Sequence, residues 1–177
     1  MKLREHIYYL ERIGGTTTTH SNRSLNDHLM GTYNILKSWG CREYVCIAGL
    51  FHSIYGTKKF KPALVNPENR FDIVKRIGPR AELLTFFFSL ITIEVLKNAS
   101  VKKRRTTLIC DSMEIELSNL LYTQLIEISA ANFLEQIPHL VNEEGFDYEQ
   151  YVDGWDWIEG RVSEKINDHI KRSIKGT

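Results

Sequence analysis

The sequence has few cysteines and almost no net charge, and these shortages exclude several classes of protein. Its three cysteines, Cys41, Cys46 and Cys110, are odd in number and form no CxxC pair. They therefore support neither a disulfide framework nor a thiolate zinc site, and we interpret them as packing residues in a reducing compartment. The formal net charge of +1 over 177 residues gives no reason to expect nucleic acid or an anionic membrane as a partner.

Long apolar runs, glycine-rich phosphate loops and internal repeats are also missing. The longest apolar run, LLTFFFSLITIEVL at residues 83–96, is shorter than a membrane span and ends in charge. No signal-peptide pattern precedes the first expected helix, so we expect a cytoplasmic protein. A chain of this length forms one domain with a full core. The sequence leaves its oligomeric state open.

Apolar residues recur at helical spacing along most of the chain. The pattern, with its caps and breaks, predicts helices over residues 3–13, 24–39, 41–53, 67–77, 80–97, 111–137 and 158–174. The basic cluster at 102–105 is interpreted as a solvated connection. Because no segment shows sustained period-two alternation, we expect an all-α fold, a single bundle of about seven helices.

Two histidines lie on the second and third of these expected helices, where the neighbours are apolar. Ser24 and Asp27 have the spacing of a capping box, which starts a helix that carries His28 on or beside its apolar stripe. Residues 45–51 are apolar nearly all round, which is typical of a central core helix, and His52 closes that helix. We expect the two imidazoles to point toward one another.

This histidine pair has two interpretations. Neutral imidazole is the commonest protein ligand for a transition metal, and two imidazoles on adjacent packed helices are the geometry from which many metal sites start. In the other interpretation, each histidine is a core residue that a backbone carbonyl or hydroxyl satisfies.

An early helix with an inward histidine is followed by the core segment AGLFHS, by RFDIVKRIGPRAELL and by LIEISAANFLEQI. In this order the chain resembles the HD-domain superfamily of metal-dependent hydrolases, most closely the hydrolase domain of the stringent-response (p)ppGpp enzymes. The resemblance covers about residues 20–137 and implies an HD-like helical bundle, with 138–177 as a C-terminal helical extension. The segments HLMGTYNILKSWG and AGLFHSIYGT also resemble the uncharacterised domain family DUF6817, which implies no activity.

The HD resemblance implies a metal site in which His28 is the first ligand and His52 is the histidine of the HD pair. Ser53 stands where the metal-binding aspartate is expected, and Asn132 stands where the last aspartate is expected. Neutral hydroxyl and amide oxygens hold a divalent ion more weakly than carboxylates do. The resemblance therefore implies two histidine ligands with poor helpers for an ion such as Mn, Fe or Zn.

Other residues are candidates for the missing roles. Gly56 and Thr57 replace the acidic pair that helps to activate water in the (p)ppGpp hydrolases. His20, in the loop before residue 24, is a candidate third metal ligand, which would leave one position open for water or substrate. Glu82 and Glu127 are candidate catalytic carboxylates if they face inward, although solvent-facing carboxylates are more common. Residues interpreted as surface groups are His6, His139 and His169.

Positive and polar residues flank the expected site. Arg23, a candidate catalytic residue, would act with Lys58 and Lys59 at a cavity mouth to attract an anionic substrate, unless these residues are simply a solvated surface. Tyr55 would donate a hydrogen bond within the pocket, or pack on its helix. The residues expected to line a substrate pocket are Ser53, Tyr55, Lys58 and Asn132.

Two functional classes remain open. The first is a divergent HD-like metal-dependent enzyme that acts on a small, anionic metabolite by hydrolysis or, since some HD relatives use iron with oxygen, by an oxidative step. The second is a degenerate HD-like domain that binds a small molecule or a protein without chemistry and without metal. Loss of both aspartates favours the second class. Retention of two buried histidines favours the first, because an unpaired buried imidazole costs about 1 to 3 kcal/mol.

Overall fold

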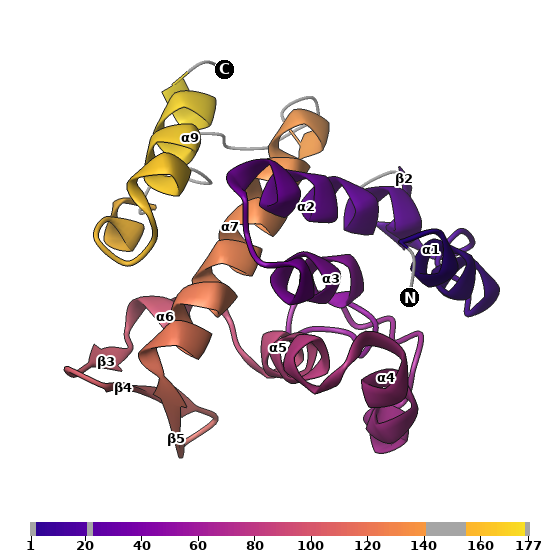
Figure 1. The fold of residues 1–177 in the computed structure, drawn as a ribbon, viewed down its shortest axis with the longest axis horizontal. Helices are drawn as coiled ribbons and strands as arrows, with labels where there is room; N and C mark the ends of the chain where they lie inside the picture. Colours follow the sequence, from indigo (N-terminus) through magenta and orange to yellow (C-terminus); the bar gives the residue numbers. More distant parts are fainter. Residues whose placement is uncertain (1–2, 21–22, 141–154, 176–177) are drawn as a thin grey trace.

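The computed structural model of the protein describes residues 3–20, 23–140 and 155–175, and most of these residues are helical (Figure 1). The helices are α1 (Leu3–Arg12), α2 (Leu25–Trp39), α3 (Glu43–Phe51), α4 (Arg70–Ile77), α5 (Pro79–Leu90), α6 (Ile93–Lys97), α7 (Asn119–Leu140) and α9 (Glu164–Lys175), with 3-10 turns η1 (Pro67–Asn69) and η2 (Asp156–Ile158).

The long helix α7 runs through the middle of the molecule, and the other core helices pack against it (Figure 1). Helices α2, α3 and α5 contact α7, and α2 and α3 contact each other. The buried side chains of these four helices form one continuous hydrophobic core. Because α2, α3 and α7 meet in this core, polar side chains on their inner faces are brought together away from water.

The predicted helix over residues 24–39 is confirmed, and local interactions fix both of its ends. The Ser24 hydroxyl accepts a hydrogen bond from the Asp27 backbone N–H at 3.1 Å. At the other end, Gly40 adopts φ 79° and its N–H bonds to the Leu36 carbonyl. Positive φ favours glycine, which explains why the helix stops there. These two caps place His28 on the second turn of α2.

The prediction of an all-α fold is wrong, because the chain also forms a three-stranded antiparallel sheet in the order β3-β4-β5. Its strands are β3 (Ser100–Val101), β4 (Arg105–Cys110) and β5 (Met113–Ser118). They occupy the expected solvated connection and the start of the helix expected over 111–137. A second, two-residue pair joins β1 (Thr19–His20) to β2 (Arg23–Ser24).

The hairpin was missed because its alternation is short and two apolar residues break it. Inward positions on β4 are filled by Thr106, Leu108 and Cys110, but Ile109 and Met113 are apolar and exposed, at 71% and 62%. Residues 111–112, interpreted from the sequence as a helix start, form the turn instead and both have positive φ. Two-residue hairpin turns require such angles.

The helix expected over 80–97 is divided in two. Helix α5 ends at Leu90, and α6 starts at Ile93. Thr92 caps α6, because its hydroxyl accepts a hydrogen bond from the Val95 N–H. The last helix begins at Glu164, later than expected. Part of the predicted C-terminal extension, residues 141–154, lies outside the described residues.

Candidate functional site

His28 and His52 point toward one another in the core, as predicted. His28 comes from α2 and His52 is the residue that caps α3. Their Nε2 atoms are 3.1 Å apart, and the two rings meet edge to face with centroids 5.0 Å apart. Both residues are almost completely buried.

Two glycines allow the three helices to approach this pair closely. A Cβ at Gly49 of α3 would lie 2.3 Å from Leu36 Cδ1 of α2. A Cβ at Gly31 of α2 would lie 2.4 Å from Glu135 Oε1 of α7. Each of the two glycines thus leaves room for a side chain from a neighbouring helix.

The Glu135 carboxylate is the polar partner of His28. Its Oε2 contacts both His28 Nδ1 and the Arg23 guanidinium, and Arg23 Nη2 lies 3.3 Å from His28 Nδ1. Burial raises the pKa of Glu135, while the hydrogen bond and charge of Arg23 oppose that rise. Arg23 therefore favours the ionised form of the carboxylate. In that form Glu135 can accept a hydrogen bond from a protonated His28 Nδ1.

These partners determine which nitrogen of each ring carries the proton. His52 Nδ1 donates to the Gly49 carbonyl at 2.7 Å, and His28 Nδ1 donates to the Glu135 carboxylate. In a neutral imidazole the other nitrogen is then an acceptor. In these tautomers two acceptor nitrogens face one another at 3.1 Å, and a proton or a metal ion shared between them would make this contact favourable.

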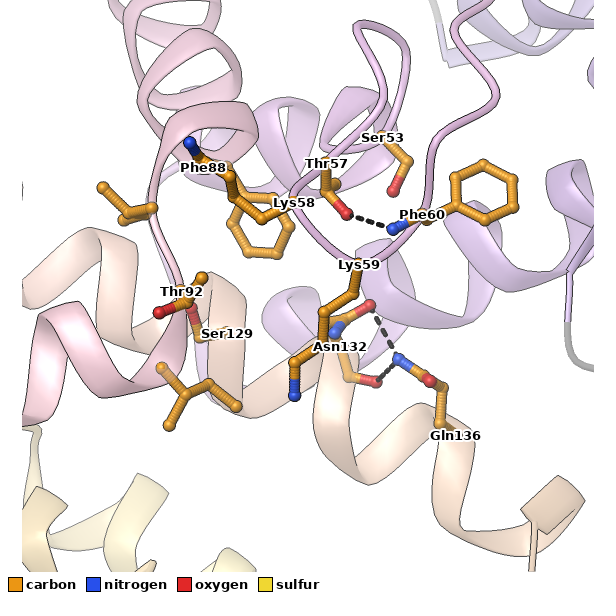
Figure 2. A pocket seen from close by; sticks show the side chains of 12 residues that line it. Ser53, Thr57, Lys58, Lys59, Phe60, Phe88, Thr92, Ser129, Asn132 and Gln136 are labelled. Carbon is orange, nitrogen blue, oxygen red and sulfur yellow. Dashed lines mark hydrogen bonds between the residues drawn. The ribbon is translucent and has the colours of Figure 1, made fainter. Parts of the chain in front are cut away.

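A cavity of about 130 Å³ is lined by side chains from α7 and from the segments around Ser53 and Phe88 (Figure 2). Ser53, which follows His52, lines it, and so does Phe88, whose ring packs edge to face on the His52 ring at 4.9 Å. The walls come from the turn after α3, the α5–α6 break and α7. The lining residues are Ser53, Thr57, Lys58, Lys59, Phe60, Phe88, Ile91, Thr92, Ile93, Ser129, Asn132 and Gln136.

The structure brings together only some of the residues that the sequence proposed for the site. Ser53, Lys58 and Asn132 line the cavity, and Arg23 contacts Glu135 beside His28. His20 belongs to β1, but its side chain lies outside the described residues.

The other proposed residues bind elsewhere. Glu82 accepts two hydrogen bonds from the Arg70 guanidinium and one from the Tyr55 hydroxyl. Neither Glu82 nor Tyr55 belongs to the cavity lining. Glu127 interacts with the Cys41 thiol, and burial raises the pKa of this carboxyl.

The remaining histidines occupy three different environments. His139 is exposed, as predicted. His6 is only 4% exposed and packs edge to face on Phe51, so its assignment to the surface is wrong. His169 is half-buried and accepts a hydrogen bond from the Trp39 indole at 2.6 Å.

Glu135 is the site residue that the sequence interpretation missed. It lies in the apolar stretch 125–137 of α7, as Glu127 does, and a carboxylate in such a stretch is the signal that could have found it. Only Glu127 was considered. When a helix is buried on all sides, the spacing of its residues does not show which face points toward the histidines.

Residues 9–92 match the family model of DUF6817, a domain of unknown function. The match spans 84 of the 177 residues, somewhat less than half of the chain, and supports the resemblance to that family. It contains His28, His52 and Ser53, whereas Asn132 and Glu135 lie beyond it. No curated protein and no solved structure matches the chain. No helix within the described ranges is both long and apolar enough to cross a bilayer.

Proposed function

We propose that the protein is a divergent HD-like, metal-dependent enzyme that hydrolyses a small metabolite, with His28 and His52 as ligands of one divalent transition-metal ion. The observation that supports this proposal is the pair of buried acceptor nitrogens 3.1 Å apart. Imidazole ligands lie about 2 Å from a bound ion, so two of them are at most about 4 Å from each other. The observed separation satisfies that condition.

The two imidazoles fit Zn or Fe best, whereas Mn would take more of its ligands from water or substrate oxygens. Among the side chains that the structure describes, no group of three or more His, Cys, Asp or Glu residues is placed to bind a metal ion. Two protein ligands would leave several positions for solvent or substrate. When bound, a divalent ion supplies Lewis-acid polarisation of a substrate oxygen.

The chain's own residues prepare the pair for this role. Glu135 holds the proton on His28 Nδ1, and the Gly49 carbonyl does the same for His52. Carboxylate and carbonyl partners of this kind fix the orientation of metal-binding histidines and increase their basicity. Arg23 holds the Glu135 carboxylate in place, and the Phe88 ring covers one side of His52 against water.

Metal content tests the proposal directly. Protein purified without chelator or affinity nickel should contain a transition metal, or should bind Zn²⁺ or Mn²⁺ in calorimetric titration. His52→Ala should abolish that binding, and His139→Ala, which changes an exposed histidine, should not. Wild type that binds neither ion, or a His139 variant that loses as much affinity as the His52 variant, would refute the metal site.

A double variant tests the HD-like geometry. Ser53 and Asn132 line the same cavity, so Ser53→Asp with Asn132→Asp should add two carboxylates near the imidazoles and increase the affinity for Mn²⁺. If the cavity lacks the HD arrangement, the carboxylates stay unpaired and lower the melting temperature without a gain in affinity. Titration with Mn²⁺, and melts with and without it, separate these results.

A binding domain without chemistry is the second candidate function. It is favoured by the neutral oxygens of Ser53 and Asn132, which stand where HD enzymes carry carboxylates. In such a protein the two imidazoles share a proton, whose charge Glu135 balances, and the cavity binds a small molecule. Metal-free protein that binds a ligand in the cavity, with no affinity for Zn²⁺ or Mn²⁺, would establish this function instead.

A further inference from the structure

The cavity beside the histidine pair presents hydrogen-bond donors without partners. Ser53 and Ser129 are only 2% and 5% exposed, yet both line the cavity. Neither hydroxyl has a hydrogen-bond partner among the described residues. Asn132 uses its side-chain oxygen to accept a bond from Gln136 Nε2 at 3.1 Å, which leaves its NH₂ group available. These polar groups line the cavity, where a ligand would provide the partners that polar groups in protein interiors normally have.

One ammonium group in the cavity is also unpaired. Lys58 contacts the Asp111 carboxylate on the β4–β5 turn. Lys59 acts electrostatically on Glu94, but it forms no ion pair within the described part of the chain. In Figure 2 the Lys59 side chain reaches toward α7, which carries Ser129 and Asn132. No carboxylate belongs to the described cavity lining, so the charge there is positive.

The size and the apolar wall limit what this site can hold. The apolar part of the lining is formed by Phe60, Phe88, Ile91 and Ile93. The volume of about 130 Å³ is well below the ~300–1,000 Å³ of pockets for drug-sized ligands. It suits an anionic group with a stem of a few carbon atoms, whereas a nucleoside would remain outside.

We propose that this cavity is an oxyanion subsite that binds a small carboxylate or phosphate monoester through Lys59, Ser53, Ser129 and Asn132, with the short stem against Phe88. The inference deepens the proposed function, because it assigns the substrate class of the same site. Ser53 follows His52 in the chain and Phe88 touches the His52 ring, so the bound group lies beside the histidine pair. The substrate is thus a small anion and not a nucleotide such as (p)ppGpp.

The experiment is a titration of isotope-labelled full-length protein followed by backbone amide NMR shifts. The probes are n-propyl phosphate and propionate, with n-propanol, n-propylamine and guanosine diphosphate for comparison. We expect one or both anions to bind with a Kd of about 1 mM, as suits ligands of this size. Shifts should centre on residues 53, 59, 129 and 132. The tighter of the two anions identifies the phosphate or the carboxylate as the preferred group.

Matched variants assign the interactions. Lys59→Gln should weaken anion binding about tenfold and Ser129→Ala about threefold, in proportion to the loss of a charged and a neutral hydrogen bond. Lys61→Gln changes an exposed lysine of the same loop that does not line the cavity, and should leave binding unchanged. Equal losses for Lys59→Gln and Lys61→Gln would show a diffuse charge effect and overturn the proposal.

Other outcomes overturn it as well. These are binding of propanol or propylamine as tight as that of the anions, tighter binding of guanosine diphosphate than of n-propyl phosphate at the same residues, and no anion shift up to about 50 mM. The titrations are repeated with His52→Ala, in which anion binding should persist. Wild type that binds an anion but neither Zn²⁺ nor Mn²⁺ refutes only the proposed metal site, whereas wild type that binds metal but no anion refutes only the subsite.

Discussion

Among the described residues, the buried glutamates Glu82 and Glu135 are each paired with an arginine, but their contacts differ. Glu82 and Glu135 are 2% and 7% exposed. The Glu82 carboxylate accepts two hydrogen bonds from Arg70, of 2.6 and 2.8 Å, and one from the Tyr55 hydroxyl, of 3.1 Å. The Arg70 guanidinium also lies 3.5 Å from the centre of the Phe86 ring. Both oxygens of Glu82 are thus satisfied within the fold.

Glu135 instead concentrates its contacts on one oxygen, which Arg23 and His28 share. Through His28 the interaction continues to His52, and from there to the wall of the cavity. Burial of an ion pair is therefore not sufficient evidence of a functional site. The Glu82 pair is confined to the contact that holds α4 to α5, whereas the Glu135 pair leads to the facing Nε2 atoms of His28 and His52.

The largest expected effect comes from breaking the structural pair. Arg70→Met leaves the Glu82 carboxylate buried without its cation, and should lower the free energy of unfolding by about 3 kcal/mol. Adding Glu82→Gln to this variant should recover much of the loss, because no buried charge remains. Urea denaturation measures both. Lys75→Met, which removes an exposed ion pair from the same helix, is the control and should show no measurable change. An Arg70 variant as stable as wild type would erase the distinction between the two pairs.

The functional pair should respond in metal affinity. Glu135→Gln removes the carboxylate that orients His28, and should weaken binding of Zn²⁺ or Mn²⁺ about 10- to 100-fold. Glu127→Gln, on the same helix but beside Cys41, should leave the affinity unchanged. Calorimetric titration of the two variants provides the measurement. Equal affinities for both variants would show that Glu135 does not act through His28.

Alanine substitutions at Gly31 and Gly49 should have smaller effects, and they separate a loss of stability from a loss of metal affinity. Alanine at either position introduces a close contact, and should lower the free energy of unfolding by about 1 kcal/mol after the gain in helix propensity. At Gly49 the contacted atom is the tip of Leu36, which can rotate. At Gly31 it is Glu135, which His28 and Arg23 hold.

Only Gly31→Ala should therefore reduce metal affinity, by a few-fold, as calorimetry would show alongside thermal melts. If Gly49→Ala reduces it as much, the loss reflects general repacking of α2 against α3.

His6 extends the comparison to a buried titratable group whose pKa is dominated by burial. Its Nδ1 has no hydrogen-bond partner in the described structure, and burial lowers its pKa. The unfolded chain therefore binds the proton more readily, so His6 should cost stability as the pH falls below about 6.5. Between pH 7.5 and 5.5, wild type should lose up to about 1 kcal/mol more than His6→Phe does in urea titrations. Identical pH dependence of the two proteins would contradict this assignment.

Local sequence signals predicted those parts of the fold that local interactions form. The α2 boundaries follow from the Ser24 cap and from Gly40, and both act within a few residues. The β4–β5 hairpin was not predicted, because exposed Ile109 and Met113 hide its alternation. Its turn was interpreted as the start of a helix, since Asp111 followed three residues later by Glu114 resembles a capping box.

Apolar neighbours at helical spacing are enough to place His28 and His52 on buried helix faces. Which carboxylate contacts them depends on how the helices pack. Glu82, Glu127 and Glu135 all lie in apolar helical stretches, and their spacing is equally compatible with an inward role. Glu135 meets His28 across 107 residues of chain, because α7 packs against α2 where Gly31 leaves room for its side chain. Such a contact depends on how helices are placed in space, which the period of a helix does not encode.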